Sequence, residues 1–167
     1  MTTTNSASIA AALTSPPTKS DVRHSGGRVR VKSETVEIPA AFAAADQVRF
    51  FTVKAHDSIK SIRMWSDDIA TTSCTIDWGI YPAGAGSAVI SLDCYATDVN
   101  HAVAILDQEL RYEILDINTM NQAVWQDAGV STEPAAGTEY ELVATVVAVT
   151  LPLTGTISVL MTYTSGD

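Results

Sequence analysis

Apolar and polar residues alternate along most of this chain, and a repeat of two residues is the pattern of β-strands. The clearest segment is 74–81, in which Cys74, Ile76, Trp78 and Ile80 share one face and polar or small residues occupy the other. We expect this segment to be a half-buried strand. Because such a strand must cover its apolar face, the pattern predicts a protein built from packed β-sheets.

The same alternation returns in short segments along the chain, and turn-forming residues separate them. The segment 82–87 reads Pro-Ala-Gly-Ala-Gly-Ser and is typical of a hairpin loop, and 151–155 is a turn expected to join the last two strands as an antiparallel hairpin. Eight or more short strands predict an all-β fold, an antiparallel β-sandwich with jelly-roll topology. The expected strands are 28–32, 36–38, 47–54, 58–65, 74–81, 88–95, 110–114, 140–148 and 156–164.

One segment, 118–128, departs from the strand pattern. Asn118 can cap the start of a helix, Met120 and Val124 fall on one apolar stripe, and Gly129 suits the position just after a helix end. The sequence therefore predicts one short helix within the sandwich.

The first 27 residues show neither a strand nor a helix period. They combine Thr, Ser and Ala with Pro16-Pro17, which favours an extended track, and Gly26-Gly27, which allows a bend before the first strand. We interpret residues 1–27 as an extended N-terminal arm and residues 28–167 as the β-sandwich domain. The alternative is a disordered tail.

Charge is distributed unevenly between the start of the chain and the rest. Residues 1–33 carry five basic side chains and one acidic side chain, a net charge of +4, whereas the remaining 134 residues carry a net charge of −13. The acidic body argues against binding of nucleic acid, which requires clustered cations. The basic positions that we expect to bind another protein subunit are Lys19, Arg23, Arg28, Arg30 and Lys32. The alternative is that these cations lie over carboxylates of their own body.

Membrane and redox signals are weak. The chain begins without the basic start of a secretion signal, and its longest apolar run, 142–153, is shorter than the ~20 residues of a membrane-spanning helix. No membrane contact is expected. Cys74 and Cys94 are predicted to be buried free thiols, with a cross-strand disulfide as the alternative.

No catalytic, metal or cofactor site is predicted. His24, His56 and His101 lie far apart and form no zinc-binding pattern, and no phosphate-binding glycine motif occurs. A hydrolase that uses Asp67, Asp68 or His101 is the weakest hypothesis.

Trp65 is the one tryptophan expected to face a ligand. Trp78 lies on the apolar face of its strand and Trp125 on the stripe of the predicted helix, whereas Ser66-Asp67-Asp68 directly follows Trp65. Since aromatic rings stack on sugars, a carbohydrate-binding module is a competing hypothesis.

Several short segments resemble small virion proteins of tailed bacteriophages. They are Trp125-Gln-Asp-Ala-Gly129 with the residues up to Pro134, and the segments 61–66, 77–81, 137–143 and 155–159. In particular, the chain resembles capsid decoration or cement proteins, which are jelly-roll modules. The resemblance supplies no catalytic residue.

The resemblance implies a non-enzymatic structural protein that binds and stabilises the outer face of a phage head. Its expected partners are the major capsid protein and further copies of itself, as a homotrimer or homodimer, with N-terminal arms that cross subunit boundaries. It would be assembled in the host cytoplasm and reside on the capsid exterior of the virion. The alternative is a carbohydrate-binding, head-fibre or tail jelly-roll module on a phage virion.

Overall fold

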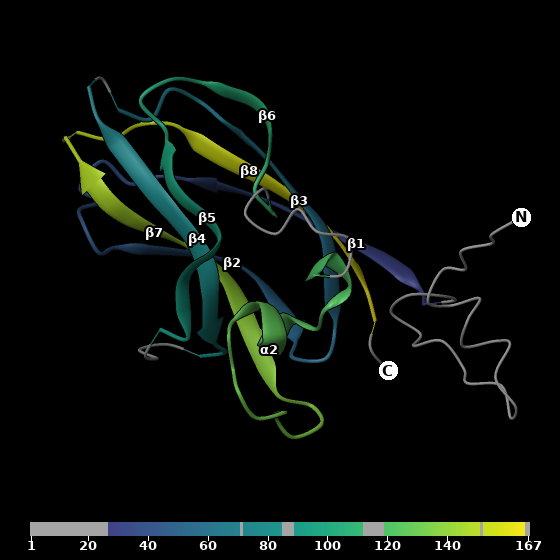
Figure 1. Cartoon of the computed structure of the whole chain (residues 1–167). Coiled ribbons are helices and arrows are strands. Elements are labelled where there is room, and N and C mark those ends of the chain that lie inside the picture. Colours follow the sequence, from purple (N-terminus) through teal and green to yellow (C-terminus); the bar gives the residue numbers. More distant parts are fainter. Residues whose placement is uncertain (1–26, 71, 85–88, 112–118, 151, 166–167) are drawn as a thin grey trace, which may run out of the picture.

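The computed structural model describes residues 27–70, 72–84, 89–111, 119–150 and 152–165 (Figure 1). The predicted arm, 1–27, therefore lies outside the described residues except for Gly27. The strands are β1 (Val29–Glu37), β2 (Gln47–Lys54), β3 (Ser58–Ser66), β4 (Cys74–Pro82), β5 (Ser91–Asn100), β6 (Ile105–Glu109), β7 (Glu139–Val149) and β8 (Thr156–Thr164). Of the described helices, none is long and apolar enough to cross a membrane.

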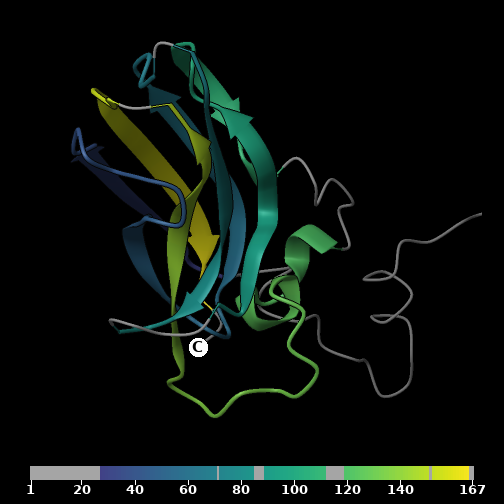
Figure 2. The same cartoon turned by 90° about the vertical axis from the view of Figure 1, so that its left-hand side faces the viewer.

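The strands form two four-stranded antiparallel sheets. One sheet has the order β1-β8-β3-β6 and the other the order β2-β7-β4-β5. Successive strands thus alternate between the layers at both ends of the chain, which is the double Greek key of a jelly roll. The predicted fold class is confirmed. Figure 2 shows the molecule after a quarter turn, with the loops around α2 at the lower end of the sandwich.

The core lies between the inner faces of the two sheets. Trp78 on β4 is fully buried and stacks on Phe50 of β2, with ring centroids 5.3 Å apart. From the other sheet, Ile62, Met64 and Met161 are also fully buried. Burial of such side chains contributes about 1.5–3 kcal/mol each, so these inner faces are the main source of stability.

The predicted hairpin of the last two strands is wrong. β7 lies between β2 and β4, and β8 lies between β1 and β3 in the opposite sheet. The connection carries the chain across the end of the sandwich, where Leu153 is fully buried and the backbone N–H of Thr154 donates to the Ile69 carbonyl at 3.0 Å. Alternation predicts which residues share a face, but it does not specify the sheet in which a strand pairs.

The strand predicted at 110–114 lies mostly outside the described residues, and the structure has a strand directly before it. The structure places β6 at Ile105–Glu109, and Tyr112 and Ile114 lie outside the described residues. The strand ends because the Glu109 carboxylate replaces a backbone acceptor: its Oε1 accepts from the N–H groups of Ile62, at 2.8 Å, and Arg111, at 3.2 Å. At the other end of the chain, the two predicted segments 28–32 and 36–38 form the single strand β1.

β4 is buried on both faces, although a half-buried strand was predicted. Asp77 is 5% exposed, and its Oδ1 accepts from the Asp98 N–H at 2.7 Å. Two residues later, a Cβ on Gly79 would lie 2.1 Å from the Ser91 carbonyl oxygen. The backbone of β5 therefore packs directly on Gly79, and the absence of a side chain there permits this approach.

The predicted helix over 118–128 is not continuous. The structure has a 3₁₀ turn, η2 (Thr119–Asn121), and one turn of α-helix, α2 (Val124–Asp127), while Asn118 lies outside the described residues. The N–H groups of Val124 and Trp125 donate to the carbonyls of Asp57, at 2.9 Å, and Ala55, at 3.1 Å. Because the β2–β3 loop uses these donors, the helix begins only at Val124.

The cysteines are free, as predicted, and no disulfide joins them. Cys74 is buried and Cys94 is half-buried. Burial raises the pKa of the Cys94 thiol to about 12, so this side chain is protonated and unreactive at neutral pH.

A buried ion pair fixes the segment around α2 against β5. Arg111 Nη2 lies 3.1 Å from Asp127 Oδ2, and both side chains are almost inaccessible. The Tyr95 hydroxyl donates to the same oxygen at 3.2 Å, and the Arg111 guanidinium lies 5.5 Å from the Tyr95 ring centroid. Burial raises the pKa of Asp127 to about 6, against the opposing effect of Arg111.

Replacement of Arg111 by Met should lower the free energy of unfolding by about 3–5 kcal/mol at pH 7.5, because the Asp127 carboxylate loses its buried partner. Chemical denaturation measures this change. Arg63→Met is the matched control, because Arg63 pairs with Asp107 at the surface, and its cost should stay below about 1 kcal/mol. An equal loss of free energy of unfolding in the two variants would contradict the stabilising role of the Arg111–Asp127 pair.

A second prediction concerns acid stability. His101 is fully buried, with Nδ1 3.1 Å from Ser66 Oγ, and burial lowers its pKa to about 4. The folded state thus favours neutral His101, so its contribution is complete above pH 6.5 and is lost as the pH falls toward 4. As the pH falls from 7.5 to 4.5, the wild type should therefore lose about 2–3 kcal/mol more of its free energy of unfolding than His101→Asn loses. Parallel stability curves of the two proteins over this range would refute the prediction.

Candidate functional site

The predicted subunit-binding cations that the structure describes lie on or beside β1. Arg30 is opposite Tyr163 and Lys32 is opposite Met161 in the β1–β8 register. Since Met161 is a core residue, Arg30 and Lys32 both project from the inner face of β1. Arg28 precedes the strand and is exposed. Lys19 and Arg23 lie outside the described residues.

Along residues 29–34 of β1, the charged side chains face inward and the apolar side chains face outward, which is the reverse of a usual sandwich strand. The inner face of β1 carries Arg30, Lys32 and Glu34, whereas Val29 and Val31 lie on the outer face and are 62% and 60% exposed. The inversion is possible because β1 is an edge strand. Its inner side chains extend beyond the core into the space between the edges of the two sheets, where water reaches them.

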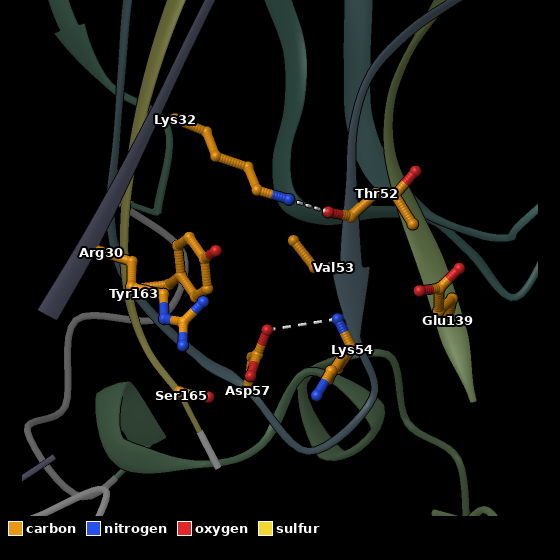
Figure 3. Close-up of a pocket in the computed structure, with 9 residues that line it drawn as sticks. All are labelled: Arg30, Lys32, Thr52, Val53, Lys54, Asp57, Glu139, Tyr163 and Ser165. Carbon is orange, nitrogen blue, oxygen red and sulfur yellow. Dashed lines mark hydrogen bonds between the residues drawn. The ribbon is translucent and has the colours of Figure 1, made fainter. Parts of the chain in front are cut away.

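That space is a groove between β1 and β2, with a volume of about 300 Å³ (Figure 3). Its cations come from two strands, Arg30 and Lys32 from β1 and Lys54 from β2, and its carboxylates are Asp57 and Glu139. The groove is thus net positive in a body of net negative charge. The remaining lining residues are Thr52, Val53, Tyr163 and Ser165.

Lys32 joins the two sheets across this groove. Its Nζ donates to the Thr52 carbonyl at 2.5 Å and lies 5.6 Å from the centroid of the Tyr163 ring. Figure 3 shows its side chain extended from β1 to β2. The contacts of Lys32 are with a carbonyl and an aromatic ring. For the basic residues as a group, the alternative that they lie over carboxylates of their own body stays a prediction.

The carboxylates of the groove face Lys54. Asp57 Oδ2 accepts from the Lys54 backbone N–H at 3.2 Å, and Glu139 is directly opposite Lys54 in the β2–β7 register. Lys54, Glu139 and Tyr163 were not among the predicted site residues, although they line the groove. Each is part of a regular alternating strand, and only the pairing of distant strands brings them beside β1.

Trp65 lies on the outer face of the β1-β8-β3-β6 sheet and is half-buried. Shallow depressions flank it, one of about 340 Å³ with Ser33, Thr35 and Ser158, and one of about 210 Å³ with Ser66 and Leu106. Trp78 is in the core, as expected. A carbohydrate-binding role for Trp65 stays a prediction.

Two residues of the weakest hypothesis, Asp67 and His101, have hydrogen-bond partners within the chain. Asp67 accepts from the N–H and hydroxyl of Thr156 at 2.9 and 2.8 Å, and these bonds lower its pKa. His101 is fully buried beside Ser66. Within the described part of the chain, no three His, Cys, Asp or Glu side chains gather to hold a metal ion.

Comparison with solved structures relates this fold to phage capsids. The chain is similar to one in the capsid asymmetric unit of cyanophage Pam1, with 19% identity, a TM-score of 0.54 and coverage of 98% of this chain and 99% of that chain. It is also similar to a chain in the capsid of Ralstonia phage GP4, with 16% identity, a TM-score of 0.61 and coverage of 84% and 86%. The chain shares its fold with proteins of phage capsids. No protein-family model and no curated protein sequence matches it.

The similarity to capsid proteins concerns the fold alone and does not extend to the groove. Identities below one fifth show a common fold, and they do not transfer a partner or a surface. The groove rests on contacts within this chain, above all those of Lys32.

Replacement of Lys32 by Met keeps the aliphatic stem and removes the ammonium group. We expect the free energy of unfolding to fall by about 1 kcal/mol, because the bond to Thr52 and the contact with the Tyr163 ring are lost. Urea denaturation measures this change. Arg28→Met, at an exposed position, should change stability by less than about 0.5 kcal/mol. A Lys32→Met variant as stable as the wild type would show that the bridge between the sheets is energetically unimportant.

Proposed function

We propose that this chain is a capsid cement protein of a phage, a non-enzymatic structural protein of the virion. It binds the major capsid protein on the outer face of the head and stabilises the shell. It requires no cofactor and binds neither nucleic acid nor membrane. Assembly takes place in the host cytoplasm.

The observation that carries this proposal is the fold similarity to chains of phage capsids over almost the whole length of both proteins. For the Pam1 capsid chain, coverage is 98% of this chain and 99% of that chain. A match of this extent includes the entire jelly roll, so the similarity is not limited to one hairpin or one sheet. It favours a role in the virion over an enzymatic role.

The charge distribution supports attachment through the N-terminal end of the domain. Arg28, Arg30 and Lys32 lie where the chain enters β1, directly after Lys19 and Arg23 in the sequence. The body that follows carries a net charge of −13. Opposite charges at the two ends orient a protein on an acidic surface, because the basic end is attracted and the acidic body is repelled.

Weak contacts are sufficient for such a protein. Copies that associate with one another on a regular lattice gain avidity, because each bound copy holds its neighbours at high local concentration. The arm and Arg28, which directly precedes β1, can therefore act together without a deep binding pocket.

Deletion of residues 1–27 should strongly weaken binding to capsids and leave the domain folded. The test adds purified protein to capsids of the phage that encodes this chain, assembled without it, and measures occupancy by co-sedimentation. The truncated protein should lose at least about tenfold in affinity, because its remaining contacts lack the arm, while its melting temperature stays within a few degrees of the wild-type value.

Charge variants of the full chain separate the effect of charge from that of arm length. Reversal of Lys19, Arg23 and Arg28 to Glu should reduce occupancy strongly, and this reduction should depend on salt. The matched control replaces Thr18, Ser20 and Ser25 by Ala and should bind as the wild type does. Full occupancy of the truncated chain would refute attachment through the arm, and absence of binding by the wild type would refute the cement role.

A further inference from the structure

β1 is the most regular edge strand of the described structure. Its nine residues pair with β8 from Val29↔Thr164 to Glu37↔Thr156 without a register shift. The other three edge strands, β2, β5 and β6, each contain a shift in their pairing. Bulges and irregularities normally protect a sheet edge from further pairing, and β1 has none.

The side chains of β1 also suit pairing with another strand. Val29 and Val31 are 62% and 60% exposed on the outer face, where an added strand would cover part of their surface. β-branched residues favour cross-strand contacts. On the inner face, Lys32 and Glu34 have opposite charges and are separated by Ser33 on the outer face.

We propose that β1 of one chain pairs antiparallel with β1 of a second copy, about a two-fold axis at Ser33. In this register, Lys32 is opposite Glu34 of the second copy, and Glu34 is opposite Lys32 of the second copy. The same geometry places Val31 opposite Thr35 of the second copy. The two sheets then join into one continuous sheet across a homodimer.

Charge complementarity selects this register. An axis at Val31 places Arg30 opposite Lys32 of the second copy, and an axis at Lys32 places two ammonium groups face to face. An axis at Glu34 opposes two carboxylates. Of the axes from Val31 to Thr35, only that at Ser33 has opposite charges directly paired and no like charges directly paired.

The dimer has a consequence for the start of the domain in each copy. Antiparallel pairing about Ser33 places Arg28 of the two copies at opposite ends of the shared strand pair, roughly 30 Å apart at 3.3 Å per residue. Each dimer would therefore present its two N-terminal segments in opposite directions. The inference concerns association of this chain with itself and does not depend on the proposed cement role.

Charge exchange between chains tests the pairing. Analytical ultracentrifugation of the full wild-type chain should show a monomer–dimer equilibrium. Lys32→Glu or Glu34→Lys, each alone, should weaken the dimer by about tenfold or more, because both cross-strand pairs become like-charged. An equimolar mixture of the two variants should recover dimers, since each variant then faces its opposite charge.

The matched control is Arg63→Glu, which makes the same change of charge on β3. It should leave the dimer unchanged, and circular dichroism should confirm that every variant is folded. Restoration by mixing cannot arise from unfolding of one variant, because the second variant supplies only a complementary charge.

A disulfide provides a second readout. Ser33→Cys should form a covalent dimer on mild oxidation, because cross-strand Cα atoms lie about 4.5–5.5 Å apart in such a pair. Ser131→Cys, in an exposed loop, should not. A wild-type chain that stays monomeric at high concentration, forms trimers, or dimerises regardless of charge at positions 32 and 34 would overturn the proposal.

Discussion

Packing between the inner faces of the two sheets is the interaction on which the rest of this molecule depends. Trp78 stacks on Phe50, and fully buried residues such as Ile62 and Met161 oppose them from the other sheet. The core is formed by strands distant in sequence, so no strand pair is stable without the other layer. The edge strands are less constrained by this packing, and on β1 charged side chains lie on the inner face while valines lie on the outer face.

Much of the fold follows from alternation in the sequence. The segments 47–54, 58–65, 74–81 and 156–164 match observed strands closely, because their apolar residues do line the core. Pairing is less predictable: β7 and β8 occupy different sheets, since the 150–155 connection crosses the end of the sandwich. The predicted helix is present but shorter than expected, because carbonyls of a distant loop accept from the N–H groups of Val124 and Trp125.

The candidate site was likewise predictable only in part from the sequence. The shared face of Arg30 and Lys32 follows from the period of two, whereas Lys54, Glu139 and Tyr163 join them only through pairing of β2, β7 and β8. The Arg111–Asp127 pair likewise cannot be predicted from the sequence, because only the fold brings Arg111, which follows β6, beside Asp127 at the end of α2. Local pattern therefore predicts faces, while the topology determines which faces meet.

We propose that the basic N-terminal end of this jelly roll is its attachment surface on a phage head. A density map of the native particle, at a resolution that traces the backbone, tests this claim most directly. We expect this chain on the outer surface, with residues 1–27 and the start of the domain against the major capsid protein. A particle without this chain, or one that contacts it through the opposite end of the sandwich, would contradict the account.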